Sequence, residues 1–150
     1  MDGIPSEFLM DYRVDLAAVG YPIGATPTGE RSTGGIRGGA FSGPRLRGVV
    51  EPFGDDWALV RPDDTLDADV HTVLRTDDDA LIYLHYTGLI HPRSTGFDGS
   101  GAEVYWRMSM RFTTAAPKYD WMNRILAIAL GRFEPTPEGR SAHYRVFEVK

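Results

Sequence analysis

The sequence contains no cysteine and no long apolar run. Without cysteine the fold relies on no disulfide and needs no oxidising compartment. No apolar run approaches the ~20 residues that a membrane-spanning helix requires. The N-terminal segment MDGIPSEF carries acidic residues and lacks the basic start and apolar block of a secretory signal. We therefore expect a cytoplasmic protein with no membrane partner.

Dense positive charge is missing as well. The formal net charge is −5 at pH 7, and the densest basic segment is Arg45-Leu46-Arg47. A protein that follows a phosphate backbone needs a longer stripe of lysine and arginine. We therefore expect no nucleic-acid partner.

Several catalytic motifs are also absent. The sequence has no nucleophile elbow and no phosphate-cradling GxxxxGK[ST] loop, and its glycine-rich segment 34–39 is not followed by a helix. Hydrolase triads of the elbow type, nucleotide-driven reactions and dinucleotide sites therefore lack their parts. We expect a protein that uses no cofactor.

What the sequence does contain is alternation of apolar and polar residues at a period of two, which is typical of β-strands. The clearest example is 104–112, where Trp106, Met108 and Met110 share one face and Arg107 lies on the other. The expected strands cover residues 8–17, 45–51, 56–61, 66–75, 80–89, 103–113, 125–133 and 141–149. The pattern breaks at 119–124, where we expect one helical turn, and no helix of normal length is expected.

Residues 20–48 hold nine of the 17 glycines, so we expect a long irregular loop there, either flexible or ordered over a pocket mouth. Residues 52–55 suit a turn between two strands. The length of 150 residues fits one domain spanning 1–150. Eight or nine antiparallel strands form a sandwich or close on themselves. We favour an all-β closed antiparallel barrel, because closure removes exposed edges and leaves an interior that is filled or holds one small ligand.

The hairpin made by 66–75 and 80–89 has a register that its apolar residues determine. Pairing the apolar sides places His71 opposite His85, with Asp69 and Tyr83 on the same second face. Cross-strand partners have Cβ atoms roughly 4.5–5.5 Å apart, so the two imidazoles and the carboxylate come within reach of one another. This face is solvated, or takes part in proton transfer and ligand binding, or holds a metal. We expect no metal, because the remaining histidines add nothing at ligand spacing.

A second polar strip lies on the strand at 103–113 and consists of Tyr105, Arg107, Ser109 and Arg111. Either it binds a carboxylate or an enolate oxygen, or it is a plain surface strip, which is the commoner fate of such a face. The three tryptophans, Trp57, Trp106 and Trp121, fit either a core or the wall of a pocket.

Five segments together resemble a known family. They are residues 38–48, 54–61, 74–83, 105–107 and 116–123. Their order and spacing resemble the uncharacterised bacterial and fungal family called domain of unknown function 3237, over about 11–149. Two positions depart from that pattern. Asp79 replaces the glycine of an Asp-Gly turn, and Tyr86 stands where asparagine is frequent.

The resemblance implies a small closed β-barrel, often dimeric, with the glycine-rich segment and the Trp-Asn segment near one mouth. No general reaction is assigned to the family. The positions that match its pattern, and that the resemblance makes pocket candidates, are Asp56, Trp57, Asp69, Tyr83, Tyr105, Arg107, Trp121 and Asn123.

The leading hypothesis is a cofactor-independent isomerase, cyclase or lyase acting on a small, partly apolar carbonyl or phenolic compound. Asp69 or Asp56 is the expected base, and Tyr105 and Arg107 are expected to stabilise an enolate-like oxygen. The expected ligand-binding residues are Trp57, His71, Tyr83, His85, Trp121 and Asn123. A non-catalytic carrier is the first alternative. A structural barrel with a filled interior follows if the polar faces turn outward.

Overall fold

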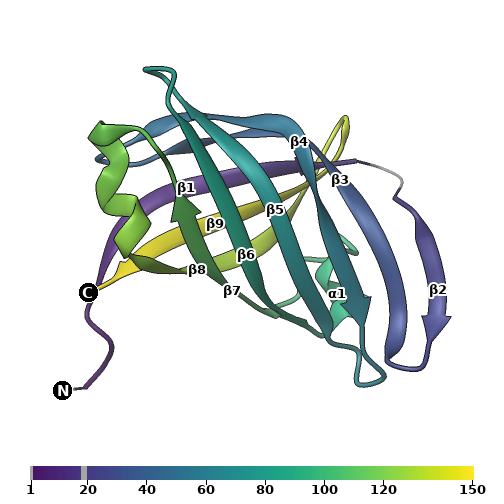
Figure 1. Ribbon diagram of the computed structural model, residues 1–150. Helices are drawn as coiled ribbons and strands as arrows, with labels where there is room; N and C mark the ends of the chain where they lie inside the picture. The colour runs from purple at the N-terminus through teal and green to yellow at the C-terminus, as the bar shows by residue number, and fades with distance from the viewer. Residues whose placement is uncertain (1, 18–19) are drawn as a thin grey trace.

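A computed structural model describes residues 2–17 and 20–150, and these form a closed antiparallel β-barrel (Figure 1). The strands are β1 (Ser6–Leu16), β2 (Pro22–Thr26), β3 (Gly29–Ser42), β4 (Arg47–Val60), β5 (Leu66–Thr76), β6 (Leu81–His91), β7 (Tyr105–Thr113), β8 (Leu126–Thr136) and β9 (Gly139–Val149). Two short helices complete the fold, α1 (Arg93–Gly96) and the 3-10 segment η1 (Pro117–Arg124). No helix in the described part of the chain has the length and apolarity to cross a bilayer.

The barrel closes because β1 pairs on both of its sides. Tyr12 of β1 lies opposite Tyr144 of β9 and opposite Phe41 of β3. Eight strands, β1 and β3 to β9, therefore form a continuous ring, and β2 is an additional strand that pairs with β3. The closed barrel and the helical turn expected at 119–124 are confirmed.

The glycine-rich segment is a correction to the sequence-based expectation. Residues 20–48 do not form a long loop, since they contain β2 and the whole of the 14-residue β3. The register of β3 against β4 shifts between Gly35 and Gly39, and Gly39 has a φ of 147°. A Cβ at Gly39 would lie 2.0 Å from the Arg13 carbonyl oxygen of β1. The glycines thus permit a bulged strand and a close approach of backbones.

The turn expected at 52–55 is a second correction. β4 continues through these residues as one 14-residue strand. Its register against β5 shifts between Val50 and Gly54, and Gly54 has a φ of 114°. The Thr72 hydroxyl donates a hydrogen bond of 2.9 Å to the Phe53 carbonyl oxygen inside this irregularity. A bulge, which also uses glycine at positive φ, therefore replaces the turn.

The barrel interior is filled by one face of each strand. The inward side chains include Met10, Tyr12 and Val14 of β1, Val70 and Leu74 of β5, Leu84 and Tyr86 of β6, Trp106, Met108 and Met110 of β7, and Tyr144 and Val146 of β9. The opposite faces of β5, β6 and β7 carry the polar strips and point to solvent. Inverting these strands would bury several ionic groups, each at a cost of several kcal/mol, and would expose Trp106 to water.

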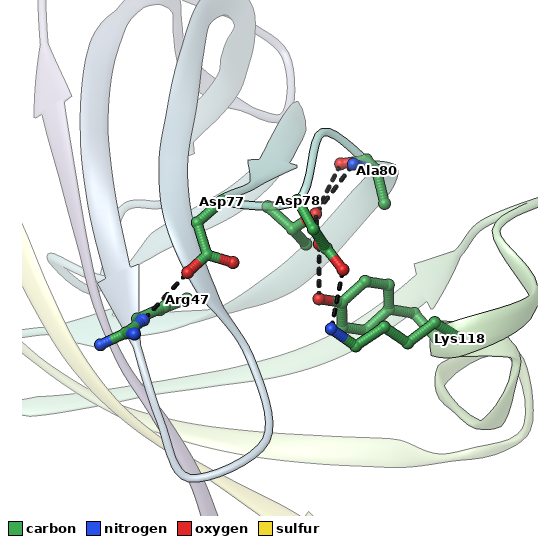
Figure 2. Close-up of polar contacts among 7 residues, drawn as sticks. Arg47, Asp77, Asp78, Ala80 and Lys118 are labelled. Carbon is green, nitrogen blue, oxygen red and sulfur yellow. Dashed lines mark hydrogen bonds and ion pairs between the residues drawn. The ribbon is translucent and has the colours of Figure 1, made fainter.

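One end of the barrel is covered by η1, the green coil in Figure 1. Its Tyr119 and Met122 are buried in the core. The β5–β6 turn holds this cap, as Figure 2 shows. Asp78 accepts hydrogen bonds of 2.7 Å from both Lys118 Nζ and the Tyr119 hydroxyl, and it also accepts one of 2.6 Å from Thr76. These bonds, with that from Lys118 as the largest contribution, hold the pKa of Asp78 well below its usual value.

Candidate functional site

Three tyrosine hydroxyls meet inside the barrel. Tyr12 of β1 and Tyr86 of β6 cross the interior and bring their hydroxyl oxygens to 3.2 Å, while Trp106 Nε1 donates a 3.1 Å hydrogen bond to the Tyr144 hydroxyl. The three tyrosine rings are 5.6 to 5.9 Å apart between centroids. Burial raises the pKa of all three phenols, so they are neutral hydrogen-bond donors at physiological pH.

Asp56 is a carboxyl group on the inward face of β4, because it lies opposite inward-facing Val70 of β5. Its Oδ1 accepts a 3.0 Å hydrogen bond from the backbone N–H of Asp69. Burial raises the pKa of Asp56 to about 6, partly offset by that hydrogen bond and reinforced by the nearby charges of Asp69 and Asp55. Negative charge on Asp56 would in turn raise the pKa of Tyr86, so the carboxyl and the phenol are electrostatic neighbours.

The residues of β3 that lie beside Asp56 are glycines. Gly34 of β3 lies directly opposite Asp56, and Gly35 follows it opposite Asp55. Within the described residues, a Cβ built on Gly34 meets no heavy atom closer than 4 Å. The described side chains therefore leave space at Gly34 beside the carboxyl group, whereas the tyrosines further inside are packed against one another.

A second cluster lies on the outer face of β5 and β6. His71 pairs directly with His85, as the hairpin register predicts, and Asp69 Oδ1 lies 2.8 Å from His85 Nε2 and 3.3 Å from His71 Nε2. The two imidazole rings stack with centroids 4.1 Å apart. The Tyr83 hydroxyl lies 2.7 Å from His71 Nδ1. We call Asp69, His71, Tyr83 and His85 the outer cluster.

A surface groove of about 440 Å³ borders the outer cluster between β6, β7 and η1. Its polar lining residues are Tyr83, His85, Arg111, Thr113, Asn123 and Arg124. The Asn123 side chain accepts from the Thr114 backbone N–H at 2.8 Å and donates to the Thr114 carbonyl oxygen at 3.0 Å. Asn123 therefore ties η1 to the end of β7 as well as lining this groove.

The other expected site residues lie apart from Asp56. Tyr105 is 56% exposed on the outside of β7, and the Arg107 guanidinium lies 5.1 Å from its ring and donates to the Trp106 carbonyl oxygen. Trp57 faces outward from β4 and is 45% exposed. The Trp121 ring stacks under the guanidinium of Arg45 at 3.9 Å.

The pairing of an Asp56 base with Tyr105 and Arg107 as oxyanion donors is therefore wrong in its geometry. These two side chains are on the opposite side of the barrel wall from Asp56, because the apolar face of β7 occupies the interior. Asp69 likewise belongs to the outer cluster. The phenols of Tyr12, Tyr86 and Tyr144 are buried polar groups that meet inside the barrel, and the sequence reasoning missed them. Their signal was a tyrosine within an otherwise apolar alternating face.

Comparison with known proteins agrees with this architecture. A UPF0311 protein of Rhodopseudomonas palustris is 30% identical over 112 residues, which cover 70% of this chain and 73% of that protein. A β-barrel-like protein of Acinetobacter baumannii superposes with a TM-score of 0.85 at 31% identity, over 100% of this chain and 98% of the other. A structure of an enzyme from Penicillium herquei gives a TM-score of 0.72 at 20% identity, over 98% and 95% of the two chains, and shows a shared fold.

The family model described as "Protein of unknown function (DUF3237)" matches residues 5–149. This match confirms the resemblance found in the sequence: the chain belongs to the DUF3237 family of β-barrel proteins.

Proposed function

We propose that the barrel binds a small, partly apolar carbonyl or phenolic compound beside Asp56 and catalyses a proton transfer on it. The observation that carries the proposal is an inward carboxyl group with open space next to it at Gly34 and neutral phenols further inside. Aromatic walls with a few convergent polar groups are typical of sites for small ligands.

Asp56 is suited to be the base. With a pKa of about 6 it is mostly ionised at neutral pH, and its conjugate acid is strong enough to return the proton. The carboxylate would remove a proton from the carbon next to a carbonyl group, leaving an enolate. The same proton then returns to a different carbon in an isomerisation. In a lyase reaction the enolate instead re-forms the carbonyl group and breaks the bond to a group on the neighbouring carbon, which leaves with that proton. Neither step transfers electrons to an acceptor, so the proposal invokes no cofactor.

Tyr86 is suited to stabilise the enolate oxygen. Its raised pKa keeps the phenol protonated, and a buried donor acts strongly on charge that develops nearby. To donate to the ligand, Tyr86 exchanges its 3.2 Å contact with Tyr12 for one with the substrate oxygen. The fold is compatible with catalysis, since the neighbour from Penicillium herquei is an enzyme.

A second candidate is a barrel whose interior serves only to hold the fold together. The nearly complete burial of Tyr12, Tyr86 and Trp106, each at most 1% exposed, favours it. A carrier that binds the same ligand without converting it lies between the two. These possibilities differ in what Asp56 does when a ligand is present.

The test begins with a thermal-shift screen of phenolic, lactone and polyketide-like carbonyl compounds. A ligand at about 100 times its dissociation constant adds about 2.7 kcal/mol of stability. Each binder is then incubated in D₂O, and exchange of its acidic C–H is followed by NMR. We expect wild-type protein to accelerate exchange, Asp56→Asn to abolish this acceleration while retaining binding, and the outer-face control Asp55→Asn to leave it unchanged.

Two results would count against the enzyme. Binding without exchange in the wild-type protein identifies a carrier. If no compound raises the melting temperature of either the wild-type protein or Asp56→Asn, the filled structural barrel is supported.

The expected homodimer and cytoplasmic location remain proposals. We expect a second copy of the chain to pack on the outside of β8, where Leu126, Ile128 and Leu130 are 53%, 40% and 40% exposed on one face. Sedimentation of wild-type protein and Ile128→Lys measures this. We expect a dimer that the lysine converts to a monomer, and a wild-type monomer would exclude it.

A further inference from the structure

We propose that Asp69, His71 and His85 of the outer cluster bind a divalent transition-metal ion, with Zn²⁺ as the best-suited ion. The site is on the outside of β5 and β6, across the barrel wall from Asp56, and none of its three side chains has a role in the proposed proton transfer. The spacing of the histidines in the sequence led us to expect no metal. The distances between the folded side chains point the other way.

The three ligand atoms, one from each side chain, all lie within 4.8 Å of one another. Zinc bonds to imidazole nitrogen and carboxylate oxygen are about 2.0–2.1 Å long, so neighbouring ligand atoms of a tetrahedral site lie about 3.3 Å apart. The separation of Asp69 Oδ1 from His71 Nε2 is 3.3 Å, and that from His85 Nε2 is 2.8 Å. Both distances from Asp69 are therefore within about half an ångström of the tetrahedral value.

The imidazole rings provide the remaining adjustment. They are stacked 14° from parallel, and they must tilt toward each other so that both Nε2 lone pairs point at one ion. Their side chains are 42% and 37% exposed, so solvent surrounds them on one side and the rotation meets little resistance. The two strands that carry them belong to a closed barrel and keep the Cα positions fixed.

Tyr83 determines which ring nitrogen of His71 faces the ion. Its hydroxyl lies 2.7 Å from His71 Nδ1, so Nδ1–H donates to the phenol oxygen when Nε2 binds metal. Outer partners of this kind orient a histidine ligand and select its tautomer. A solvated polar face does not require Asp69, both histidines and this tyrosine to converge on one point.

The charge around the site also suits a bound cation with an additional anionic ligand. Asp55 lies opposite His71 on β4 and adds negative charge, while Arg111 lies opposite His85 on β7 and lines the 440 Å³ groove. Two histidines and one carboxylate leave at least one coordination position open. A carboxylate of a small molecule in the groove could occupy that position and pair with Arg111.

The experiment uses the full chain, freed of metal by chelator and titrated with Zn²⁺ in a calorimeter, with Co²⁺ absorption as a second readout of coordination. We expect one ion per chain and a tetrahedral Co²⁺ spectrum. His85→Ala and His71→Ala should each weaken binding at least about 100-fold, and Tyr83→Phe should weaken it about 10-fold through the lost orientation of His71.

The matched control is His143→Ala. His143 lies on the outer face 3.9 Å from the Asp11 carboxylate, a His–Asp pair that lacks a second histidine. This variant and Asp56→Asn should bind Zn²⁺ like the wild-type protein, so a failure of the Asp56 chemistry leaves the metal site intact. Circular dichroism confirms that each variant folds. Wild-type protein that binds no stoichiometric Zn²⁺, or His85→Ala that binds it as tightly as wild type, overturns the proposal.

Discussion

Replacement of Asp56 by asparagine should stabilise the protein at neutral pH. Burial raises the pKa of this carboxyl from 3.8 to about 6, so ionising it costs more in the folded than in the unfolded chain. A difference of about two units corresponds to about 3 kcal/mol, since each unit is worth about 1.4 kcal/mol. Asparagine carries no charge, and its side-chain oxygen can still accept the hydrogen bond from the Asp69 backbone N–H.

The pH dependence gives the sign of this effect. Between pH 3.8 and about 6 this carboxyl is protonated in the folded chain and ionised in the unfolded chain. Its contribution to the free energy of unfolding is therefore most favourable below pH 3.8, and it is lost as the pH rises through about 6. The difference in free energy of unfolding between Asp56→Asn and wild type should therefore be small near about pH 4. It should grow by up to about 3 kcal/mol by about pH 7.5.

Urea unfolding at a series of pH values measures this difference directly. All other titrating groups are shared by the two proteins, so their contributions cancel in the comparison. Asp55→Asn, which changes the neighbouring carboxyl on the outer face, is the matched control and should lack the growth at neutral pH. A difference that stays constant from about pH 5 to 7.5 would refute the reasoning, because it would mean that Asp56 is as well solvated as a surface carboxyl.

Three further substitutions test the packing. Asp79→Gly should stabilise the protein by about 0.5–1 kcal/mol, because Asp79 has a φ of 70°, which glycine adopts without strain. The ion pair that is lost with Arg75 is largely exposed and contributes little, and an unchanged urea midpoint would contradict this prediction. Tyr86→Phe should destabilise by about 1 kcal/mol, because the buried Tyr12 hydroxyl loses its partner, and equal stability would show that the pair is not formed. Met122→Ala should cost about 2–5 kcal/mol through a cavity under η1, as thermal unfolding will show, and a loss below about 1 kcal/mol would mean that η1 does not cap the core.

Much of the fold follows from the alternation of apolar and polar residues. In the β5–β6 hairpin the apolar faces align in one register, and the same register sets His71 against His85. A slip of one residue would expose every apolar side chain of the hairpin. The outer cluster could therefore be predicted from the sequence, and the structure adds the distances from which the metal site is proposed.

The irregular strands could not be predicted in the same way. Glycine at positive φ serves both a tight turn and a β-bulge, and the choice at Gly39 and Gly54 depends on strands that are distant in the sequence. Gly39 needs to lack a side chain because β1 passes beside it, a contact made only when the barrel closes. Local composition holds no information about that neighbour.

The orientation of the polar strips was decidable in principle from burial energies. A barrel of eight strands has room inside for one face of each strand, and placing Asp69, Arg107 and the two histidines there would have required several ions to leave water. Asp56 is an exception to this rule, as is the buried Glu148, which forms ion pairs with Arg45 and Lys150. The Asp56 carboxyl lies on the inward face, and at neutral pH its burial opposes folding by about 3 kcal/mol. Packing alone gives no reason for a carboxyl at that position, opposite a glycine that leaves space beside it. Such local violations of folding rules are expected at functional sites, and this is why the search for a ligand should begin at Asp56.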